Sequence, residues 1–471
     1  MPFLSYLWVG SRKTLEVDDK KKACGITLDL SRQKISQKDF SSLLEFLQSR
    51  KVIESFNDMR QGKTVNISEQ RSALHTSLRD PSPFAPHAKE VKETLERVCK
   101  FADNIRNRQW KGITGEPITD VINIGIGGSE LGPRTVYNAL RKEKNQIKLH
   151  FLAPADGIIF DRITEGLNPF KTLVVISSKS FKTLETQANS AEILNWFNKA
   201  GIEGKDLSKH VVVVSSKLEA PEQIGIPKSN FFPIWDWVGG RFSVWSAAGL
   251  PIAIALGSDV FRRFLAGAHE MDEHASHFPL MDNLPALMAA FAYWNVNKVD
   301  VSSFCFLPYD ERLRTMVDWL QQLEMESLGK SISTSGKPVV GKTSLPVWGG
   351  HGNESQHSFF QWLREGTSRN AIDVCWCKTP GHLHKELNKV LMSNVNAQIE
   401  ALIMRNANSM YFNVLSTLTL DNLEPETLGA LMALYEHKTT MLGTLLDINP
   451  FDQPGVELGK ILAKKVIEET I

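Results

Sequence analysis

The residues best suited to chemistry lie in the stretch SSKSFKTLET, residues 177–186. It follows KTLVVI, a β-branched run typical of a buried strand, and leads into TQANSAEILNWF, whose apolar spacing favours a helix. In open α/β sheets, ligands bind at the carboxyl ends of the strands, where the next helix presents unpaired N–H groups. A helix cap would use one hydroxyl, whereas Ser178, Ser180 and Thr183 supply three. The stretch therefore predicts a binding loop for a small dianion such as phosphate.

Two further stretches could transfer protons. QQLEMESLGKS places Glu326 in the last turn of a helix that Gly329 should end, where the negative end of the helix dipole makes a carboxylate a better base. GGHGNESQHSFFQ places His357 in the first turns of a helix capped by Asn353 or Ser355, where the positive end favours the neutral imidazole. Each residue taken alone also fits a solvated glutamate or a structural histidine.

Two more stretches offer groups that could bind an anionic ligand. VGGRFSVWS sets Arg241 between a glycine pair and a very apolar helix, so we expect a half-buried guanidinium that needs an anion. FDQPGVELGK is a polar turn followed by the start of a helix, with Gln453 and Lys460 as candidate ligands.

Three other motifs are weaker indications of a binding site. GKPVVGKT, residues 336–343, fits the nucleotide-binding P-loop template, but it follows polar residues and leads into a strand-like segment instead of a helix. CWCKTPGHLH, residues 375–384, could supply metal ligands, although its cysteines are spaced as neighbours on one face of a strand. GIGGSELG, residues 125–132, lacks the third glycine of the dinucleotide fingerprint and fits either a tight turn or a close approach to a ligand.

The elements that must position these residues alternate along the chain. DVINIGIG, IKLHFLA, TLVVISS and HVVVVSS read as strands separated by helices, and SSFCFLPY, SLPVWGG and IDVCWC form a second set. We expect two α/β sandwiches with mainly parallel sheets, at residues 101–270 and 271–425. A helical arm without a strong strand precedes them at 1–100, a helical tail follows at 426–471, and VWSAAGLPIAIALG is expected to be a buried core helix.

Composition narrows the class of protein. The 471 residues are 23% charged and 42% hydrophobic with a net charge of +1, so nothing indicates a nucleic-acid partner. Five cysteines do not make a disulfide framework, and MPFLSYLWVGSRK lacks the basic start of a signal peptide. No apolar stretch is long enough to span a membrane. We expect a cytoplasmic protein.

Taken together, the motifs resemble those of the glucose-6-phosphate isomerase family. VGGRFSVWSAAGLPIAIALG and FDQPGVELGKILAKK match its two signature stretches, and IGIGGSELGP, SSKSFKTLET, QQLEMESLGK and GNESQHSF match in family order. NISEQRSALHTSLR, from about residue 66, resembles its N-terminal motif, so the similarity covers most of the chain. It implies a sugar-isomerase fold and reversible conversion of glucose 6-phosphate to fructose 6-phosphate without cofactor or metal.

The resemblance also implies roles for individual residues. Glu326 would move a proton between C2 and C1, Arg241 would stabilise the enediolate, and His357 and Lys460 would help to open the sugar ring. The substrate and its phosphate would be held by Ser129, Ser178, Lys179, Ser180, Thr183, Gln322 and Gln453. In this family the histidine comes from the partner subunit, which implies a homodimer with a shared active site.

The sequence departs from the usual family pattern at several positions. SKSFKT stands where SKTFTT is usual, so Lys182 replaces a hydroxyl, and Leu328 and Pro454 replace an asparagine and a tryptophan. GNESQH and QWLREGT likewise stand for GTNGQH and QLIHQGT. Two rival functions are a regulator that binds a sugar phosphate without converting it and a phosphotransferase that uses Lys342.

Overall fold

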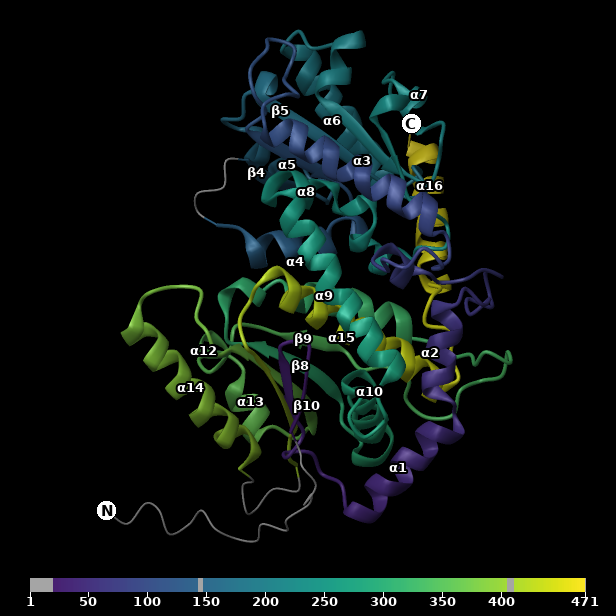
Figure 1. Cartoon of the computed structure of the whole chain (residues 1–471), viewed down its shortest axis with the longest axis vertical. Coiled ribbons are helices and arrows are strands. Elements are labelled where there is room, and N and C mark those ends of the chain that lie inside the picture. The colour runs from purple at the N-terminus through teal and green to yellow at the C-terminus, as the bar shows by residue number, and fades with distance from the viewer. Residues whose placement is uncertain (1–19, 143–146, 405–410, 471) are drawn as a thin grey trace.

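The computed structural model describes residues 20–142, 147–404 and 411–470. The N-terminal segment assessed above as a possible signal peptide lies outside these residues. Eleven strands form two sheets in the described part of the chain, one in each lobe of the molecule (Figure 1). Within the same ranges, no helix is both long and apolar enough to cross a bilayer.

The upper lobe contains a five-stranded sheet in which all neighbours are parallel, in the order β4-β3-β5-β6-β7. Its strands are β3 (Asp120–Ile124), β4 (Lys148–Leu152), β5 (Thr172–Ser177), β6 (Val211–Ser215) and β7 (Phe231–Pro233). Alternate residues of β5 enter two different cores: Leu173 and Val175 face one, and Val174 and Ile176 face the other. A strand buried on both faces has to be apolar throughout, which explains the run TLVVI.

The lower lobe contains a six-stranded sheet in the order β1-β2-β11-β10-β8-β9. Its strands are β1 (Lys20–Ala23), β2 (Ile26–Asp29), β8 (Ser303–Pro308), β9 (Val347–Gly349), β10 (Asn370–Cys377) and β11 (Val414–Leu420). The four later strands are parallel, whereas β1 and β2 form an antiparallel hairpin on the edge.

The expected strands are confirmed in both lobes, with one correction. The N-terminal arm was expected to lack a strong strand, but β1 and β2 lie within it. The polar run KKKA hides β1 because an edge strand exposes half of its side chains, as the alternating exposure along Lys20–Ala23 shows. The division at residues 101–270 and 271–425 remains a proposal, supported by the placement of one parallel set of strands in each range.

Helices cover both sheets and join the lobes. The first half of the chain contributes α1 (Gln37–Ser49), α2 (Val52–Arg60), α3 (Ala88–Arg106), α4 (Leu131–Leu140), α5 (Gly157–Thr164), α6 (Leu184–Lys199), α7 (Ala220–Gln223) and α8 (Leu250–Leu256). The second half contributes α9 (Ser258–His277), α10 (Leu284–Trp294), α11 (Met316–Leu320), α12 (Gly352–Ser355), α13 (Phe360–Glu365), α14 (Lys385–Ile403), α15 (Pro425–Leu446) and α16 (Glu457–Thr470).

The last two helices, α15 and α16, differ in burial. α15 is buried along almost its whole length and packs against α9 in the middle of the molecule (Figure 1). Its apolar residues pack into the core and its buried charges, such as Glu436 and Lys438, are paired, so the expected C-terminal tail begins with a central core helix. α16, in contrast, extends away from this core, and its described side chains are exposed (Figure 1).

The apolar stretch at residues 244–257 is buried as expected. It forms the end of the 3-10 helix η6 (Gly240–Trp245), a second short turn and α8. α8 lies between α3 and the five-stranded sheet, and its side chains are at most 8% exposed. This rigid segment carries Arg241 at its start.

Candidate active site

The glycine-rich turn after β3 brings three parts of the site together. A Cβ on Gly128 would lie 1.9 Å from the carbonyl oxygen of Gly240, and one on Gly127 would lie 3.0 Å from Nε2 of Gln322. A Cβ on Gly125 would lie 3.0 Å from the carbonyl oxygen of Ser177, at the end of β5. The turn therefore has a steric requirement for glycine, because the backbone of one lobe closes directly on neighbouring segments.

Ser129 completes this turn as the last residue of η2 (Gly127–Ser129) and is partly exposed. Its carbonyl oxygen accepts a hydrogen bond from Nδ2 of Asn123 at 3.1 Å, which fixes the turn against β3. The predicted position of GIGGSELG, after a strand and before α4, is confirmed.

The predicted dianion loop leaves the carboxyl end of β5 and enters α6, as expected. Ser178 Oγ accepts a hydrogen bond from the Phe181 amide at 3.2 Å, and Ser180 Oγ accepts one from the Lys182 amide at 3.3 Å. Phe181 has a φ of 53°, so the two serines stabilise a tight, left-handed loop. Both hydroxyls can still donate to a ligand.

Thr183 stands at the N-cap of α6, but its side chain makes no capping bond. The first amides of α6 therefore lack a side-chain acceptor from this residue. Together with the two serine hydroxyls, this leaves a group of donors at the positive end of a helix dipole.

Lys179 holds the loop in place. Its Nζ donates to the carbonyl oxygens of Asp236 at 2.9 Å and Val238 at 2.8 Å, just before the segment that carries Arg241. Burial and, to a smaller extent, the positive charge of Arg71 lower the pKa of Lys179 to about 8. A bound phosphate would add the opposite charge that this ammonium lacks.

Glu326 ends η10, a π-helical segment (Gln321–Glu326) that continues α11. The helix stops before Gly329, as predicted, and π-helical turns are frequent at functional sites. Glu326 Oε2 accepts a hydrogen bond from Arg241 Nη1 at 3.1 Å, and Oε1 accepts one from Gln322 Nε2 at 3.4 Å. Its side chain is 30% exposed, so the carboxylate is both held and accessible.

Arg241 is fully buried, with 2% exposure, whereas the sequence predicted a half-buried guanidinium. The difference arises because the guanidinium is surrounded by acceptors. Nε donates to Ser327 Oγ at 2.7 Å, Nη1 donates to Gln453 Oε1 at 2.9 Å as well as to Glu326, and Nη2 donates to the carbonyl oxygens of Pro450 and Asp452. Arg241 thus joins the proposed base and Gln453 in one array.

A buried ionic cluster fixes the segment that carries Arg241. Arg79 donates to both carboxylate oxygens of Asp272, at 2.8 and 2.7 Å, and to Glu436 at 3.0 Å. Trp245 Nε1 donates to the other oxygen of Glu436 at 2.7 Å, and the Arg79 guanidinium lies 4.2 Å from the Trp245 ring centroid. Because a buried charge needs its partners, this cluster resists any movement of η6.

His357 and Lys460 are not joined to this array by any contact among the described residues. His357 lies in the turn between α12 and α13 instead of in the first turns of a helix, and Ser355 belongs to α12, whose N-cap is His351. Its side chain is exposed. Lys460 is 63% exposed on α16 and pairs with Glu457 at 2.7 Å.

The P-loop-like motif and the paired cysteines lie in the structures that their flanking sequences predicted. GKPVVGKT forms an exposed loop with neither a strand before it nor a helix after it, and Lys342 pairs with Asp300 at 2.6 Å. Cys375 and Cys377 are buried on β10. In the described ranges, no group of three or more His, Cys, Asp or Glu residues is arranged to hold a metal.

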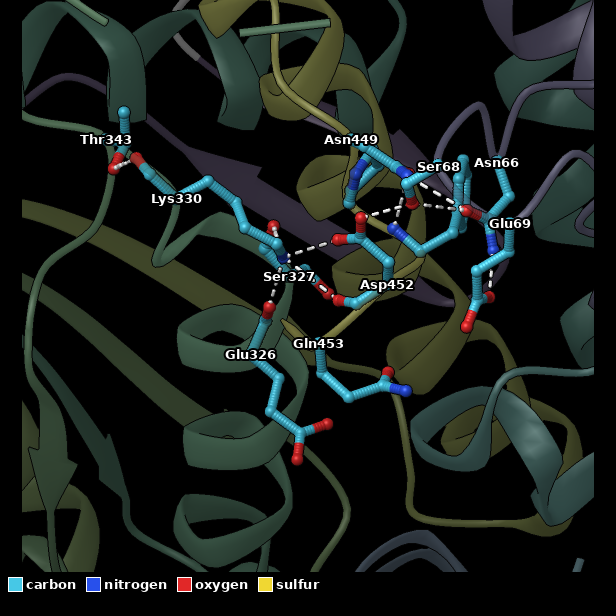
Figure 2. A network of polar contacts seen from close by, with 12 residues as sticks. Asn66, Ser68, Glu69, Glu326, Ser327, Lys330, Thr343, Asn449, Asp452 and Gln453 are labelled. Atoms are coloured by element: carbon cyan, nitrogen blue, oxygen red, sulfur yellow. Dashed lines mark hydrogen bonds and ion pairs between the residues drawn. The ribbon is translucent and has the colours of Figure 1, made fainter. Parts of the chain in front are cut away.

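Sequence reasoning missed three residues beside the array: Lys330, Asp452 and Ser68. Lys330 Nζ donates to the carbonyl oxygens of Glu326 and Asp452, and Ser68 Oγ donates to the Asp452 carboxylate (Figure 2). A lysine directly after a helix end was a usable signal, because a cation is favourable there. The contact with Ser68, 384 positions away, left no signal in the sequence.

The chain is similar to known proteins over most of its length. The sequence model of the phosphoglucose isomerase family, described as "Phosphoglucose isomerase", matches residues 29–471. A glucose-6-phosphate isomerase from Shewanella halifaxensis is 40% identical over 96% of this chain and 89% of its own length. One from Saccharophagus degradans is 41% identical over 94% of this chain and 86% of its own.

A solved structure is similar over nearly the same range. The crystal structure of a glucose-6-phosphate isomerase from Chlamydia trachomatis has a TM-score of 0.87 and 31% sequence identity, covering 96% of this chain and 90% of that one. With its ordered motifs, its two mainly parallel sheets and a similarity that covers nearly the whole chain, the chain belongs to the phosphoglucose isomerase family.

Proposed function

We propose that this protein interconverts D-glucose 6-phosphate and D-fructose 6-phosphate through a cis-enediol(ate), a reaction of glycolysis and gluconeogenesis. The observation that carries the proposal is the pairing of Glu326 with Arg241 at 3.1 Å. The glycine-rich turn links this pair to the loop at the end of β5. A base, a cation and a dianion loop in one site are what an aldose–ketose isomerase needs.

Glu326 is the proposed base. It takes the proton from C2 of the open-chain sugar and returns it to C1, so one carboxylate serves both directions. Negative charge then develops on the sugar oxygens, where the Arg241 guanidinium stabilises it. Because Arg241 is buried and held by five other oxygens, its charge needs no reorganisation during the reaction.

The loop of Ser178, Lys179, Ser180 and Thr183 is the proposed phosphate site. Phosphate binding away from C1 and C2 supplies energy that holds the carbon chain against Glu326. Ser129, Gln322 and Gln453 are proposed to contact the substrate, and Gln322 and Gln453 contact Glu326 and Arg241, respectively.

His357 and Lys460 are the proposed ring-opening residues, and a second copy of the chain is proposed to complete the site. Both side chains are exposed in the single chain. Lys460 shares α16 with Leu458, Ile461 and Leu462, which are 52–65% exposed. Exposed apolar residues at this spacing indicate a helix face that another protein covers.

A similar apolar surface lies near His357. Trp362 on α13 is 44% exposed, and Leu387 and Val390 on α14 are 66% and 57% exposed. Burial of both surfaces in a homodimer would bring the two groups to a site. For location, we propose the cytoplasm, because all five cysteines are free thiols, which suits a reducing compartment.

The experiment is conversion of fructose 6-phosphate in D₂O, followed by NMR, with and without EDTA. We expect deuterium at C2 of the glucose 6-phosphate formed and equal rates in chelator. Glu326→Gln should lower kcat by about 10²–10⁴-fold with little change in substrate binding. Glu116→Gln, which removes an exposed carboxylate paired with Lys171, is the matched control.

Two outcomes contradict the proposal. Near-normal turnover by Glu326→Gln would remove Glu326 as the base. Wild-type protein that binds the sugar phosphate but produces neither product nor deuterium exchange would instead be a binding protein.

A further inference from the structure

Lys330 caps the C-terminal end of the helix that carries Glu326. Its Nζ donates to the carbonyl oxygen of Glu326 at 2.6 Å and to that of Ser327 at 3.1 Å. The last carbonyls of a helix have no amide partner within it, and a cation at this end also opposes the helix dipole. The lysine that follows the helix therefore fixes its final turn, at the residue that bears the carboxylate.

The same ammonium also holds the segment that bears Gln453. Nζ donates to the carbonyl oxygen of Asp452 at 3.0 Å and forms an ion pair with Asp452 Oδ1 at 3.3 Å. Both side chains are nearly buried, at 10% and 12% exposure. In Figure 2 the side chains of Glu326 and Gln453 extend from this network on the same side, away from the Lys330 ammonium.

Arg241 and Lys330 bind the same two segments from different directions. Both donate to the Asp452 carbonyl oxygen, while Arg241 also binds the side chains of Glu326 and Gln453. The result is a closed ring of contacts. Lys330 binds the backbones of Glu326 and Asp452 and the Asp452 carboxylate, while Arg241 binds the Asp452 backbone and the side chains of Glu326 and Gln453. The Glu326 carboxylate is thus held in position both through its backbone, by Lys330, and directly, by Arg241.

A third segment supports the ring from outside (Figure 2). Ser68 Oγ donates to Asp452 Oδ2, and Asn449 Nδ2 donates to Ser68 Oγ and to Asn66 Oδ1, both at 2.9 Å. The N-terminal strip at residues 66–71 therefore holds the Asp452 carboxylate toward Lys330. None of these residues reaches the dianion loop through a hydrogen bond.

We propose that Lys330, with Asp452 as its counter-ion, is a positioning residue that sets the distance between the Glu326 carboxylate and the substrate carbons. The proposal rests on the isomerase function proposed above. The Lys330 ammonium binds the backbone of Glu326 and not its carboxylate, which extends away from it (Figure 2), so loss of Lys330 should lower kcat and leave substrate binding almost unchanged. A shift of about 1 Å in a catalytic group can reduce the rate by about 10²-fold.

The test compares Lys330→Met with Lys342→Met, which breaks another lysine–aspartate pair, Lys342–Asp300 at 2.6 Å, on the surface. We expect a 10- to 100-fold lower kcat for Lys330→Met, with KM within about threefold, at a temperature where both variants are folded. Lys342→Met should match the wild type. Asp452→Asn keeps the shape of the side chain and should show a smaller loss of kcat. This second variant tests the proposal even if Lys330→Met does not fold.

Rescue separates positioning from simple loss of stability. In Lys330→Ala, n-propylammonium replaces the missing atoms and should restore part of kcat, whereas n-propanol, which has the same shape without the charge, should not. Hydrogen exchange should become faster at residues 326–330 and 450–453 in Lys330→Met and stay unchanged at 178–184.

Each failure has a distinct meaning. Wild-type protein without isomerase activity would contradict the proposed function, while the exchange measurement would still test the contacts. Active wild type with unchanged kcat in both Lys330 variants would overturn the positioning role. So would a rise in KM at constant kcat, or equal rescue by propanol.

Discussion

The region around Glu326 and the region around His357 and Lys460 differ in how completely one chain builds them. Glu326 is held by Arg241 and Gln322, its backbone is held by Lys330, and Arg241 itself is 2% exposed. His357 and Lys460 stand on exposed surfaces, and among the described residues the contact of Lys460 is with its helix neighbour Glu457.

This difference indicates a division of labour. Proton transfer between two carbons requires a base placed to within a fraction of an ångström, and a buried network inside one chain supplies that precision. Ring opening uses groups that have to meet the substrate from another direction. The exposed apolar residues of α14 and α16 support the proposal that a second chain completes the site.

The largest effect is expected on the buried side. Arg241→Met removes the donor to the Gln453 amide oxygen and the Pro450 carbonyl oxygen. It also leaves the Glu326 carboxylate with Gln322 alone and the Asp452 carbonyl oxygen with Lys330 alone among the described donors. We expect kcat to fall by about 10²–10³-fold. The free energy of unfolding should fall by about 3–5 kcal/mol, because a buried ion pair loses one partner. Denaturant unfolding and steady-state kinetics check both; full stability would show that the array is not held as described.

Substitution of Lys460 should lower kcat without lowering stability. Lys460→Met removes an exposed charge whose one described contact is Glu457, so Tm should not change. If Lys460 acts in ring opening, kcat should fall by about 10²-fold with cyclic substrate and much less with substrate that is already open. Lys465→Met, on the same helix and paired with Glu469, is the matched control. Equal rates for the two variants would place Lys460 outside the site.

The phosphate loop should respond to pH through Lys179, whose pKa burial lowers to about 8. The ammonium is protonated below this value and becomes neutral above it, while the substrate phosphate stays dianionic throughout. If the charged form binds phosphate, KM should rise by up to about tenfold between pH 7 and pH 9. Lys179→Arg keeps its charge and should abolish this rise; a rise that persists in that variant would assign the effect to another group.

The smallest effect is expected at Lys182, an exposed lysine in the same loop. Lys182→Thr removes one charge near the proposed phosphate, and about 1 kcal/mol or less of attraction in water corresponds to at most a fivefold rise in KM. The difference between wild type and variant should shrink at 0.5 M salt. A larger effect that does not depend on salt would mean direct, desolvated contact with the phosphate.

Much of this arrangement could be predicted from local sequence. The strands at 120–124 and 172–177 are buried on both faces, so their continuous apolar runs could be recognised in the sequence. The polar stretch after β5 could be recognised by its contrast with these runs. Glu326 before Gly329 and the glycine-rich turn were likewise readable, because helix ends and tight turns leave local signals.

Features that depend on distant contacts could not be predicted. The burial of Arg241 depends on carbonyls at positions 450 and 452, and the role of Lys330 depends on Asp452. The edge strand β1 was hidden by its polar residues. His357 was placed in a helix because Asn353 and Ser355 resemble caps, whereas the structure breaks that helix in two around it.

The most direct test mixes two inactive variants, Glu326→Gln and His357→Ala, after each dimer has been dissociated and allowed to reassociate. If each site takes Glu326 from one chain and His357 from the other, half of the dimers are mixed and each has one intact site. The account predicts recovery of about a quarter of the wild-type activity. Activity that stays at the sum of the two separate variants would show that a single chain supplies both residues.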